Sequence, residues 1–579
     1  MSKFINNEKK TQIVEKLNFL FGAEKTENVY CKLSKLVDEF NHNMKQAGDS
    51  KLWLDEKDIF LITYGDSIKE DEKPTLQSLH EFLKENLSEH LEYVHILPFY
   101  PYSSDDGFSV IDYFKVNKEL GNWNNVEEMS VDFKMMFDAV INHISAKSDW
   151  FQEYLKGNPK YKNYFIETED LPELLKVFRP RALPLLTKFE TAAGEKLIWT
   201  TFSTDQIDLN YKDEDVFLKI IELLLFYASK GAKAIRLDAI GFMWKEIGTN
   251  CMHLPQAHTA IQLFRDIFSV TAPETLIITE TNVPHKENIS YFGDGNNEAQ
   301  LVYQFPLPPL VLYSFVSGSA GYLSKWADSL ELISDKTTFF NFLASHDGIG
   351  VVPTKGILTP DELNLVAENV KANGGRVSYK ATPEGEIPYE LNINYFDAVS
   401  DKNTSLDVNI DRFLASQAIL LSMVGVPAIY IHSLLGSRNW QEGVELTSMN
   451  RSINREKLCR KTLEKELVED GSLRNQVFTR YKELIKIRKS QKAFHPNASH
   501  KVIFVNDSVF TLARTSIDGS ETILAMINVS KEKQKLSLEP EKYGISANSL
   551  TDLVSGLDIG VSKGKLDIEL DPFQVMWLK

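Results

Sequence analysis

Eight short apolar runs, each separated from the next by residues with helical spacing, constrain the fold of this chain more than any other feature. Strands that alternate with helices build parallel sheets, and eight of them favour a closed (β/α)8 TIM barrel over an open doubly wound sheet. The sequence therefore predicts an α/β fold with a barrel at its core. The predicted strands cover residues 60–64, 93–97, 135–140, 233–237, 275–279, 301–305, 338–342 and 427–431.

Segments too long to be simple connections divide the chain around this barrel. One lies between the third and fourth predicted strands, and another, near 350–410, lies between the seventh and eighth. Apolar residues recur at helical spacing before the barrel, and after it apolar and polar residues alternate as in an antiparallel sheet. The predicted divisions are an N-terminal helical extension at 1–55, the first part of the barrel at 56–143, an inserted domain at 144–228, the rest of the barrel at 229–495 and a C-terminal β domain at 496–579.

The charge and the apolar content restrict the partners of the chain. The formal net charge is −17 and no dense block of Lys and Arg is present, so we expect no nucleic-acid partner. No run of about 18 apolar residues occurs and the first ten residues lack an apolar signal core, so we expect no membrane contact and a cytoplasmic protein. We expect a monomer or a homodimer. Cys31, Cys251 and Cys459 are too far apart for a disulfide framework or a zinc site.

Three of the predicted strands lead into carboxylates, at the end where a parallel barrel carries catalytic residues. Transfer of a glycosidic bond needs one carboxylate that stays ionised and one carboxylic acid that stays protonated until it is used. Arg236 would lower the pKa of Asp238, as the first role requires, and the apolar run before Glu280 would raise its pKa for the second. Asp347, beside His346, could hold sugar hydroxyls. Singly, each acid could instead pair with a cation or cap a helix.

Further candidates follow the second and third strands. Phe108 offers a ring for the apolar face of a pyranose, and His143 closes the third strand. Phe202, at the end of the strand-like run 197–202, is another candidate for substrate binding. A metal role for Asn142 stays open, but no acid cluster supports it and we expect no metal. Taken alone, each of these residues is as readily structural.

Four segments in one order resemble the signature regions of the alpha-amylase superfamily: residues 138–143, 235–239, 279–282 and 344–350. With the flanking domains, the resemblance covers nearly all of residues 55–579. It implies that Asp238 is a nucleophile, that Glu280 is an acid/base catalyst and that Asp347 stabilises the transition state. It also implies a set of residues that hold the donor glucose: Asp106, His143, Arg236 and His346.

Within this superfamily the chain is most similar to the sucrose-phosphorylase branch. The similarity implies that Arg451 reaches the donor glucose and that Arg181 and Tyr389 meet phosphate. A phosphorylase must bind an anion beside its glucosyl-enzyme, and arginine is the usual bidentate partner of phosphate. Without the rest of such a site, Arg181 and Arg179 would be a solvated pair on a loop. The segments that carry the similarity are 178–184, 307–312, 346–351 and 450–455.

Positions that border the expected acceptor site differ from typical sucrose phosphorylases. Glu390 stands in place of glutamine, Phe242 in place of tyrosine, and the pair at 281–282 in place of Val-His. These departures put sucrose as the substrate in doubt. The helical extension and the segments 341–350 and 434–439 are instead similar to glucosylglycerate phosphorylases.

That resemblance implies a reversible reaction of a small-molecule glucoside with retention: 2-O-α-D-glucosylglycerate and phosphate give α-D-glucose 1-phosphate and D-glycerate. Inorganic phosphate is a substrate, and no cofactor is expected. The alternatives are a phosphorylase for sucrose, glucosylglycerol or sucrose 6'-phosphate, a retaining α-glucosidase, and a non-catalytic sugar-binding protein. Glu390 and its neighbours would decide between the phosphorylases.

Overall fold

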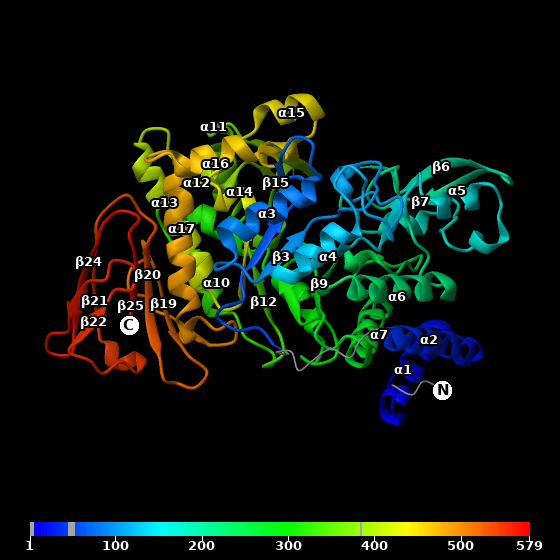
Figure 1. Ribbon diagram of the computed structural model, residues 1–579, viewed down its shortest axis with the longest axis horizontal. Helices are drawn as coiled ribbons and strands as arrows, with labels where there is room; N and C mark the ends of the chain where they lie inside the picture. Colours follow the sequence, from blue (N-terminus) through cyan, green and yellow to red (C-terminus); the bar gives the residue numbers. More distant parts are fainter. Residues whose placement is uncertain (1–4, 44–52, 182, 383–384) are drawn as a thin grey trace.

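The computed structural model describes residues 5–43, 53–181, 183–382 and 385–579. At its centre is a closed barrel of eight parallel strands, each beside the next one along the chain, with the last closing on the first (Figure 1). All eight predicted strands are strands of this barrel, so the predicted (β/α)8 fold is confirmed. They are β1 (Phe60–Thr63), β3 (Tyr93–Ile96), β4 (Lys134–Ala139), β9 (Ala232–Leu237), β10 (Leu276–Thr279), β11 (Leu301–Tyr303), β12 (Thr338–Asn341) and β16 (Val426–Tyr430).

Helices cover the outside of the barrel and bury their apolar residues against it (Figure 1). The start of α6 shows how the sequence sets such a helix, because the Asp213 side chain accepts hydrogen bonds from the N–H groups of Asp215 and Val216. In the described part of the chain, no helix has the length and apolar character needed to cross a membrane. The principal helices are α3 (Thr75–Leu87), α4 (Trp123–Asp132), α6 (Glu214–Ser229), α7 (Pro255–Thr271), α9 (Leu307–Ser317), α10 (Gly321–Asp328), α13 (Leu406–Ser422) and α17 (Leu473–Lys489).

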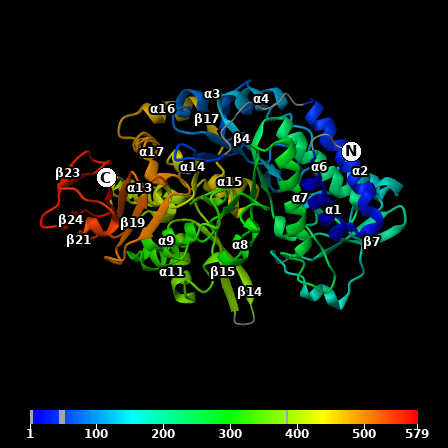
Figure 2. The ribbon, with the colours of Figure 1, turned by 90° about the horizontal axis from the view of Figure 1, so that it is seen from below.

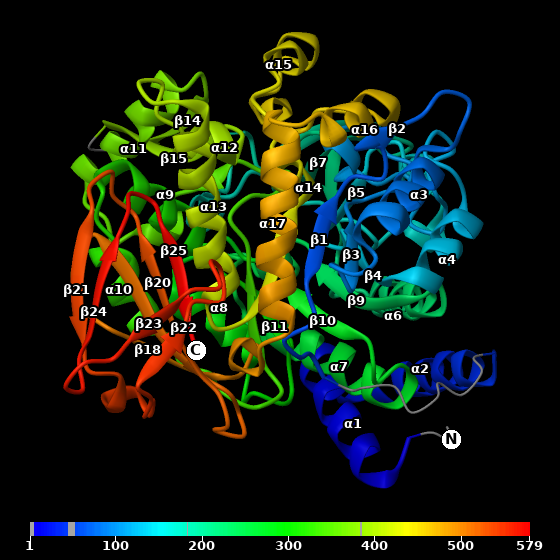
Figure 3. The ribbon, with the colours of Figure 1, turned by 60° about the vertical axis from the view of Figure 1, so that its left-hand side comes forward.

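Two long excursions leave the barrel after β4 and after β12. Strands β14 and β15 of the second excursion lie at the top of Figure 3, at the opposite end of the barrel from α1. In that excursion β13, β15 and β14 form one antiparallel sheet. The first contains β5 (His143–Ser145), α5 (Asp149–Leu155), β6 (Leu186–Thr191), β7 (Gly194–Trp199) and β8 (Gln206–Asp208), and the second contains β13 (Ile349–Gly350), α11 (Pro360–Ala372), β14 (Arg376–Thr382) and β15 (Gly385–Asn392).

The predicted antiparallel sheet at the C-terminal end is confirmed. Its four strands follow the order β18, β19, β20, β25, and two further strand pairs lie beside it. The two further pairs were not predicted. The strands are β18 (Ser499–Val502), β19 (Val509–Thr515), β20 (Thr522–Asn528), β21 (Gln534–Leu538), β22 (Ser549–Thr551), β23 (Asp558–Gly560), β24 (Leu566–Leu570) and β25 (Val575–Leu578).

Arg514 of β19 joins this sheet to the last turn of α13, where the buried Arg488 of α17 also binds. Arg514 donates to the carbonyl oxygens of Ser422 at 2.6 Å and His495 at 2.8 Å, and Arg488 donates to that of Leu421 at 3.0 Å. The Trp577 indole N–H donates to the Ser422 hydroxyl at 3.0 Å. The last carbonyls of a helix have no partner within it, so these bonds from other segments satisfy them.

Two helices at the N-terminal side pack against the barrel helices. α1 (Asn7–Phe21) contacts α7, and α2 (Ala23–Asn43) contacts α6 and α7, on the far side of the molecule from the C-terminal sheet (Figure 2). Lys9 and Lys16 of α1 both pair with Asp266 of α7, at 2.9 and 2.6 Å, and that carboxylate is only 7% exposed. The predicted extension also includes residues 44–52, which lie outside the described residues.

We expect Asp266→Ala to weaken the attachment of α1. The change removes a buried carboxylate shared by two lysines, so the free energy of unfolding should fall by about 1–3 kcal/mol. Chemical denaturation and limited proteolysis within α1 would measure the effect. Lys32→Ala is the matched control, because its partner Asp215 is 58% exposed and the pair should contribute almost nothing. Equal effects of the two changes would contradict this assignment.

Candidate active site

A cavity of about 730 Å³ lies at the carboxyl end of the barrel and contains the three predicted carboxylates. Asp238 directly follows β9, Glu280 directly follows β10, and Asp347 lies in the segment after β12. Both excursions contribute to the wall, so residues far apart in the sequence face one space. Parallel strands bring their carboxyl ends together at one rim, which is why these three acids meet.

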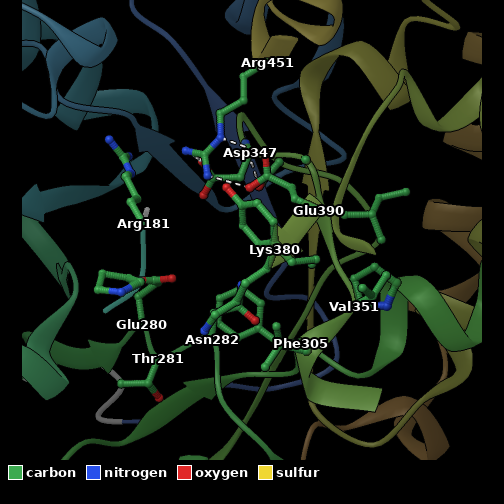
Figure 4. Close-up of a pocket in the computed structure, with 18 of the residues that line it drawn as sticks. Arg181, Glu280, Thr281, Asn282, Phe305, Asp347, Val351, Lys380, Glu390 and Arg451 are labelled. Atoms are coloured by element: carbon green, nitrogen blue, oxygen red, sulfur yellow. Dashed lines mark hydrogen bonds and ion pairs between the residues drawn. The ribbon is translucent and has the colours of Figure 1, made fainter. Parts of the chain in front are cut away.

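Almost all of the residues predicted from the sequence line this cavity. Beside the three acids, the wall contains Phe108, His143, Arg181, Phe202, Arg236, His346, Tyr389, Glu390 and Arg451. Figure 4 shows part of this wall, with Glu280 and Arg181 on one side and Glu390 on the other. Phe202 lies beyond the end of β7, on the connection to β8.

Asp106 is the predicted residue that the cavity wall does not include. Its neighbour Asp105 lines the cavity in its place, while Asp106 forms an ion pair with Arg455. Both aspartates have positive φ values, 55° and 48°, so the chain makes a left-handed turn that directs the two side chains apart. The following Gly107 is also required, since a Cβ there would lie 2.6 Å from the Pro98 carbonyl oxygen.

The Arg236 guanidinium is the centre of the charge network below the acids. It forms ion pairs with Asp138 and, at 2.9 Å, with Asp238, and it lies 3.8 Å from Glu280. Asp138 also contacts His95 at 2.7 Å. Burial alone would raise the pKa of Asp138, but Arg236 and His95 lower it to about 2, so this carboxylate is a permanent charge.

Two further carboxyl groups lie beside Arg236, those of Asp238 and Glu280. Burial raises the pKa of Asp238 well above its ordinary value and also raises that of Glu280. The expectation of a lowered pKa for Asp238 is therefore wrong, because burial and the surrounding carboxylates outweigh Arg236. A raised pKa for Glu280 is confirmed. Arg236 donates directly to Asp238 and is farther from Glu280, so of these two carboxyl groups Asp238 has the closer cation to stabilise its ionised form.

Strained backbone next to Asp238 positions Glu280. Ala239 has a φ of 48°, in the left-handed region that costs a residue with a Cβ about 1–2 kcal/mol. In this conformation its N–H donates to Glu280 Oε2 at 3.1 Å. The strain thus fixes the orientation of the carboxyl group on the neighbouring strand, as is common at functional sites.

Asp347 is held ionised by cations on its other side. Burial alone would raise its pKa, but the guanidinium groups of Arg451 and Arg455 keep it well below the usual range of a carboxyl group. Arg451 approaches Asp347 Oδ1 at 2.5 Å. His346 stacks on Phe108 with the ring centroids 4.8 Å apart, and burial lowers the pKa of His346 to about 3, so this imidazole is neutral near pH 7.

Arg451 and Arg181, which were also predicted to meet substrate, both contact carboxylates. Arg451 binds Glu390 through two hydrogen bonds, of 3.1 and 2.6 Å, drawn as dashed lines in Figure 4. Arg181 pairs with Asp105 at 3.0 Å and lies over the Phe202 ring, 5.7 Å from its centroid. Carboxylates therefore hold both guanidinium groups facing the cavity, in the fork geometry that also suits phosphate and other carboxylates.

The side chain of Asn142 binds the ammonium group of a buried lysine, Lys245. Lys245 donates to Asn142 Oδ1 at 2.7 Å and pairs with Asp208 at 2.6 Å, and both charged side chains are almost fully buried. Asn142 Nδ2 lies 3.2 Å from His143 Nδ1, so this buried pair supports a residue of the cavity wall. Within the described residues, no three His, Cys, Asp or Glu side chains gather in a way that could hold a metal ion.

Several residues of the site were not predicted from the sequence. Asp105 adjoins the predicted Asp106, and Arg455 ends the segment 450–455, but neither side chain was identified as part of the site. Gln206, which donates to Asp105 at 3.2 Å, and Lys245 carry no local signal, because their partners lie far away in the sequence.

Comparisons with known proteins place the chain in a family. The alpha-amylase catalytic domain matches residues 88–351. The chain is 48% identical over 573 residues to a glucosylglycerate phosphorylase of Spirochaeta thermophila, covering 97% of each protein. It is 43% identical to a glucosylglycerate phosphorylase of Escherichia coli, covering 98% of this chain and all of that protein. The crystal structure of sucrose 6F-phosphate phosphorylase from Thermoanaerobacter thermosaccharolyticum has the same fold, with a TM-score of 0.72 at 24% identity over 89% of this chain and 98% of that one.

We expect Lys245→Met to destabilise the protein by about 3–5 kcal/mol, because it leaves Asp208 as an uncompensated buried carboxylate. Thermal unfolding would measure the loss. Adding Asp208→Asn to Lys245→Met removes that charge and should recover part of the stability. The losses in the free energy of unfolding of the two single variants are added and compared with the loss of the double variant. A double variant that loses more than this sum would refute the pairing.

Proposed function

The chain belongs to the glucosylglycerate phosphorylases of the alpha-amylase family, and on this premise we propose that its cavity transfers a glucosyl unit reversibly between D-glycerate and phosphate, with retention. The enzyme is a hexosyltransferase. The observation that carries the proposal is the meeting of three carboxylates with Arg181 and Arg451 in one cavity. Acids alone would suit a hydrolase, whereas the arginines offer an anion site beside the reacting carbon.

In the first half-reaction Asp238 attacks C1 of 2-O-α-D-glucosylglycerate while Glu280 protonates the leaving oxygen. The bond from C1 to glycerate breaks as the bond to Asp238 Oδ forms, which gives a β-glucosyl-enzyme. Arg236 keeps Asp238 ionised for this attack, and buried Glu280 carries the proton. Asp347, a permanent anion, stabilises the positive charge that develops on the sugar ring.

In the second half-reaction a phosphate oxygen attacks C1 from the face that glycerate has left, and Asp238 is released. Arg181 and Tyr389 steer the phosphate. Phosphate already carries a nucleophilic oxyanion, so Glu280 contributes little to this step. Phosphate and glycerate are both anions and occupy the same acceptor subsite in turn, which makes Arg181 a common contact for the two.

Phosphate is a substrate of this cycle, which uses no cofactor. A cytoplasmic location is supported by the three free cysteines, since reducing compartments keep thiols in that state. The assembly is a monomer or homodimer, and light scattering of the purified protein distinguishes the two.

The direct test supplies the enzyme with glucose 1-phosphate and a panel of acceptors, namely D-glycerate, fructose, glycerol and water, and measures phosphate release. D-Glycerate should give the fastest release, with glucosylglycerate as the product. Fastest release with fructose or glycerol would favour the corresponding phosphorylase. Release without any acceptor at the same rate would identify a hydrolase.

We expect Arg181→Ala to weaken the reaction in both directions, raising KM for phosphate and for glycerate by about tenfold to a hundredfold, the value of a charge-assisted bond to an anion. Steady-state kinetics with each acceptor would show this. Lys188→Ala is the control, because this lysine pairs with exposed Glu195 outside the cavity. A variant impaired with phosphate alone would rule out a shared subsite.

The raised pKa of Glu280 sets the alkaline limit of the reaction. Phosphorolysis needs the protonated form, so kcat/KM should fall as the pH rises through this pKa, which burial raises above the ordinary value of 4.5. Glu280→Gln should lower kcat/KM for glucosylglycerate by about 10²–10⁴-fold. With α-glucosyl fluoride, whose leaving group needs little protonation, the loss should be far smaller. Equal losses with both donors would exclude Glu280 as the acid.

A further inference from the structure

The cavity is larger than the proposed substrate requires. Glucosylglycerate has roughly 18 non-hydrogen atoms, and even at about 30 Å³ for each, the share of a molecule in liquid water, it fills about 540 Å³. The cavity holds about 730 Å³. Space therefore remains in the cavity after the donor glucose and glycerate are placed. The residues of the cavity wall indicate which part of the cavity stays unfilled.

Part of the remaining wall is apolar, with four residues from the second excursion and two from the segment that follows β11. Six of its residues, which we call the apolar arm, are Phe305, Pro308, Val351, Leu358, Leu363 and Ile393. Val351, Leu358 and Ile393 are at most 6% exposed. Leu363 lies in the first turn of α11, and Pro308 lies in the first turn of α9. An apolar recess of this kind favours an apolar group.

The arm begins beside the catalytic acid. Asn282 follows Glu280 by two residues, and Gly350 packs so closely against it that a Cβ on Gly350 would lie 2.7 Å from Asn282 Nδ2. Val351, the next residue, starts the arm. Figure 4 shows Asn282 and Phe305 between Glu280 on the left and Val351 on the right. The arm is thus continuous with the space that the leaving group occupies.

Arg181 and the arm lie in different directions from Glu280 (Figure 4). The C2 atom of a 2-hydroxy acid is tetrahedral, so its hydroxyl, carboxylate and C3 substituent diverge. With the hydroxyl at Glu280 and the carboxylate toward Arg181, the C3 substituent points away from both groups. In glycerate this substituent is only a hydroxymethyl group, which leaves the arm unfilled.

We propose that the apolar arm is an acceptor subsite for 2-hydroxy carboxylic acids with a bulky apolar group on C3, so that the enzyme glucosylates such acids as well as glycerate. The inference rests on the proposed function. The acceptor hydroxyl attacks C1 of the glucosyl-enzyme and gives its proton to Glu280, the bond from C1 to Asp238 breaks, and a 2-O-glucosyl acid leaves. With glucose 1-phosphate as donor, one phosphate is released for each acid glucosylated.

The experiment compares D-glycerate with both enantiomers of 3-phenyllactate as acceptors, with glucose 1-phosphate as donor. It measures phosphate release and identifies the product by mass spectrometry. We expect one enantiomer to be glucosylated. We also expect Leu363→Trp, which fills the arm, to lower the ratio of kcat/KM for phenyllactate to kcat/KM for glycerate by at least about tenfold. Using the ratio removes any difference in the folded fraction.

Leu365→Trp is the matched control, because Leu365 lies on the same helix but is 47% exposed and does not line the cavity. Its ratio should stay at the value of the unmodified enzyme. If Leu363→Trp does not fold, Val352→Trp fills the arm from a residue that is 36% exposed and should lower the ratio likewise.

Transfer to glycerate without transfer to either phenyllactate would overturn the apolar subsite and leave the proposed function intact. Equal ratios for Leu363→Trp and Leu365→Trp would also overturn it, since phenyllactate would then bind elsewhere. If neither acid causes phosphate release, the proposed function is refuted, and the proposed subsite is refuted with it.

Discussion

The Arg236 guanidinium is buried beneath the catalytic acids and binds two carboxylates there, Asp138 and Asp238. A buried cation is stable only when anions surround it, and these anions are stable only because of the cation. This mutual dependence fixes the ends of β4 and β9 relative to each other. Glu280 is farther from Arg236 than Asp238 is. The proposed roles of Asp238 as nucleophile and Glu280 as acid rest on that difference in distance.

The rest of the site also depends on ion pairs between buried cations and carboxylates. Asp347 stays ionised because Arg451 contacts it, and Arg451 is held in place by Glu390 on a different segment. Lys245 performs a comparable task for Asn142 and Asp208 at the edge of the cavity. In this acidic chain, with a charge of −17, carboxylates thus hold Arg451 and Arg181 where both guanidinium groups line the cavity.

The sequence predicted the barrel well because each strand carries its own signal, a short apolar run that is buried on both faces. It also predicted the acids, since each stands at or after the end of such a run. Asp105 was missed because its entry into the wall depends on a left-handed turn, which the letters of the sequence do not show. The pKa of Asp238 was misjudged because burial depends on segments that are distant in sequence. Lys245 and Gln206 were missed for the same reason.

The central claim is that Asp238, held ionised by Arg236, forms a covalent bond to the glucosyl unit. A 5-fluoro-α-glucosyl fluoride donor should form this bond faster than it is broken. The ring fluorine destabilises the cationic transition states of both steps, whereas the reactive fluoride leaving group offsets this only in the first. Digestion and mass spectrometry of the trapped enzyme locate the sugar. The result predicted is one glucosyl label, on Asp238. A label on Glu280 or Asp347 would contradict the claim.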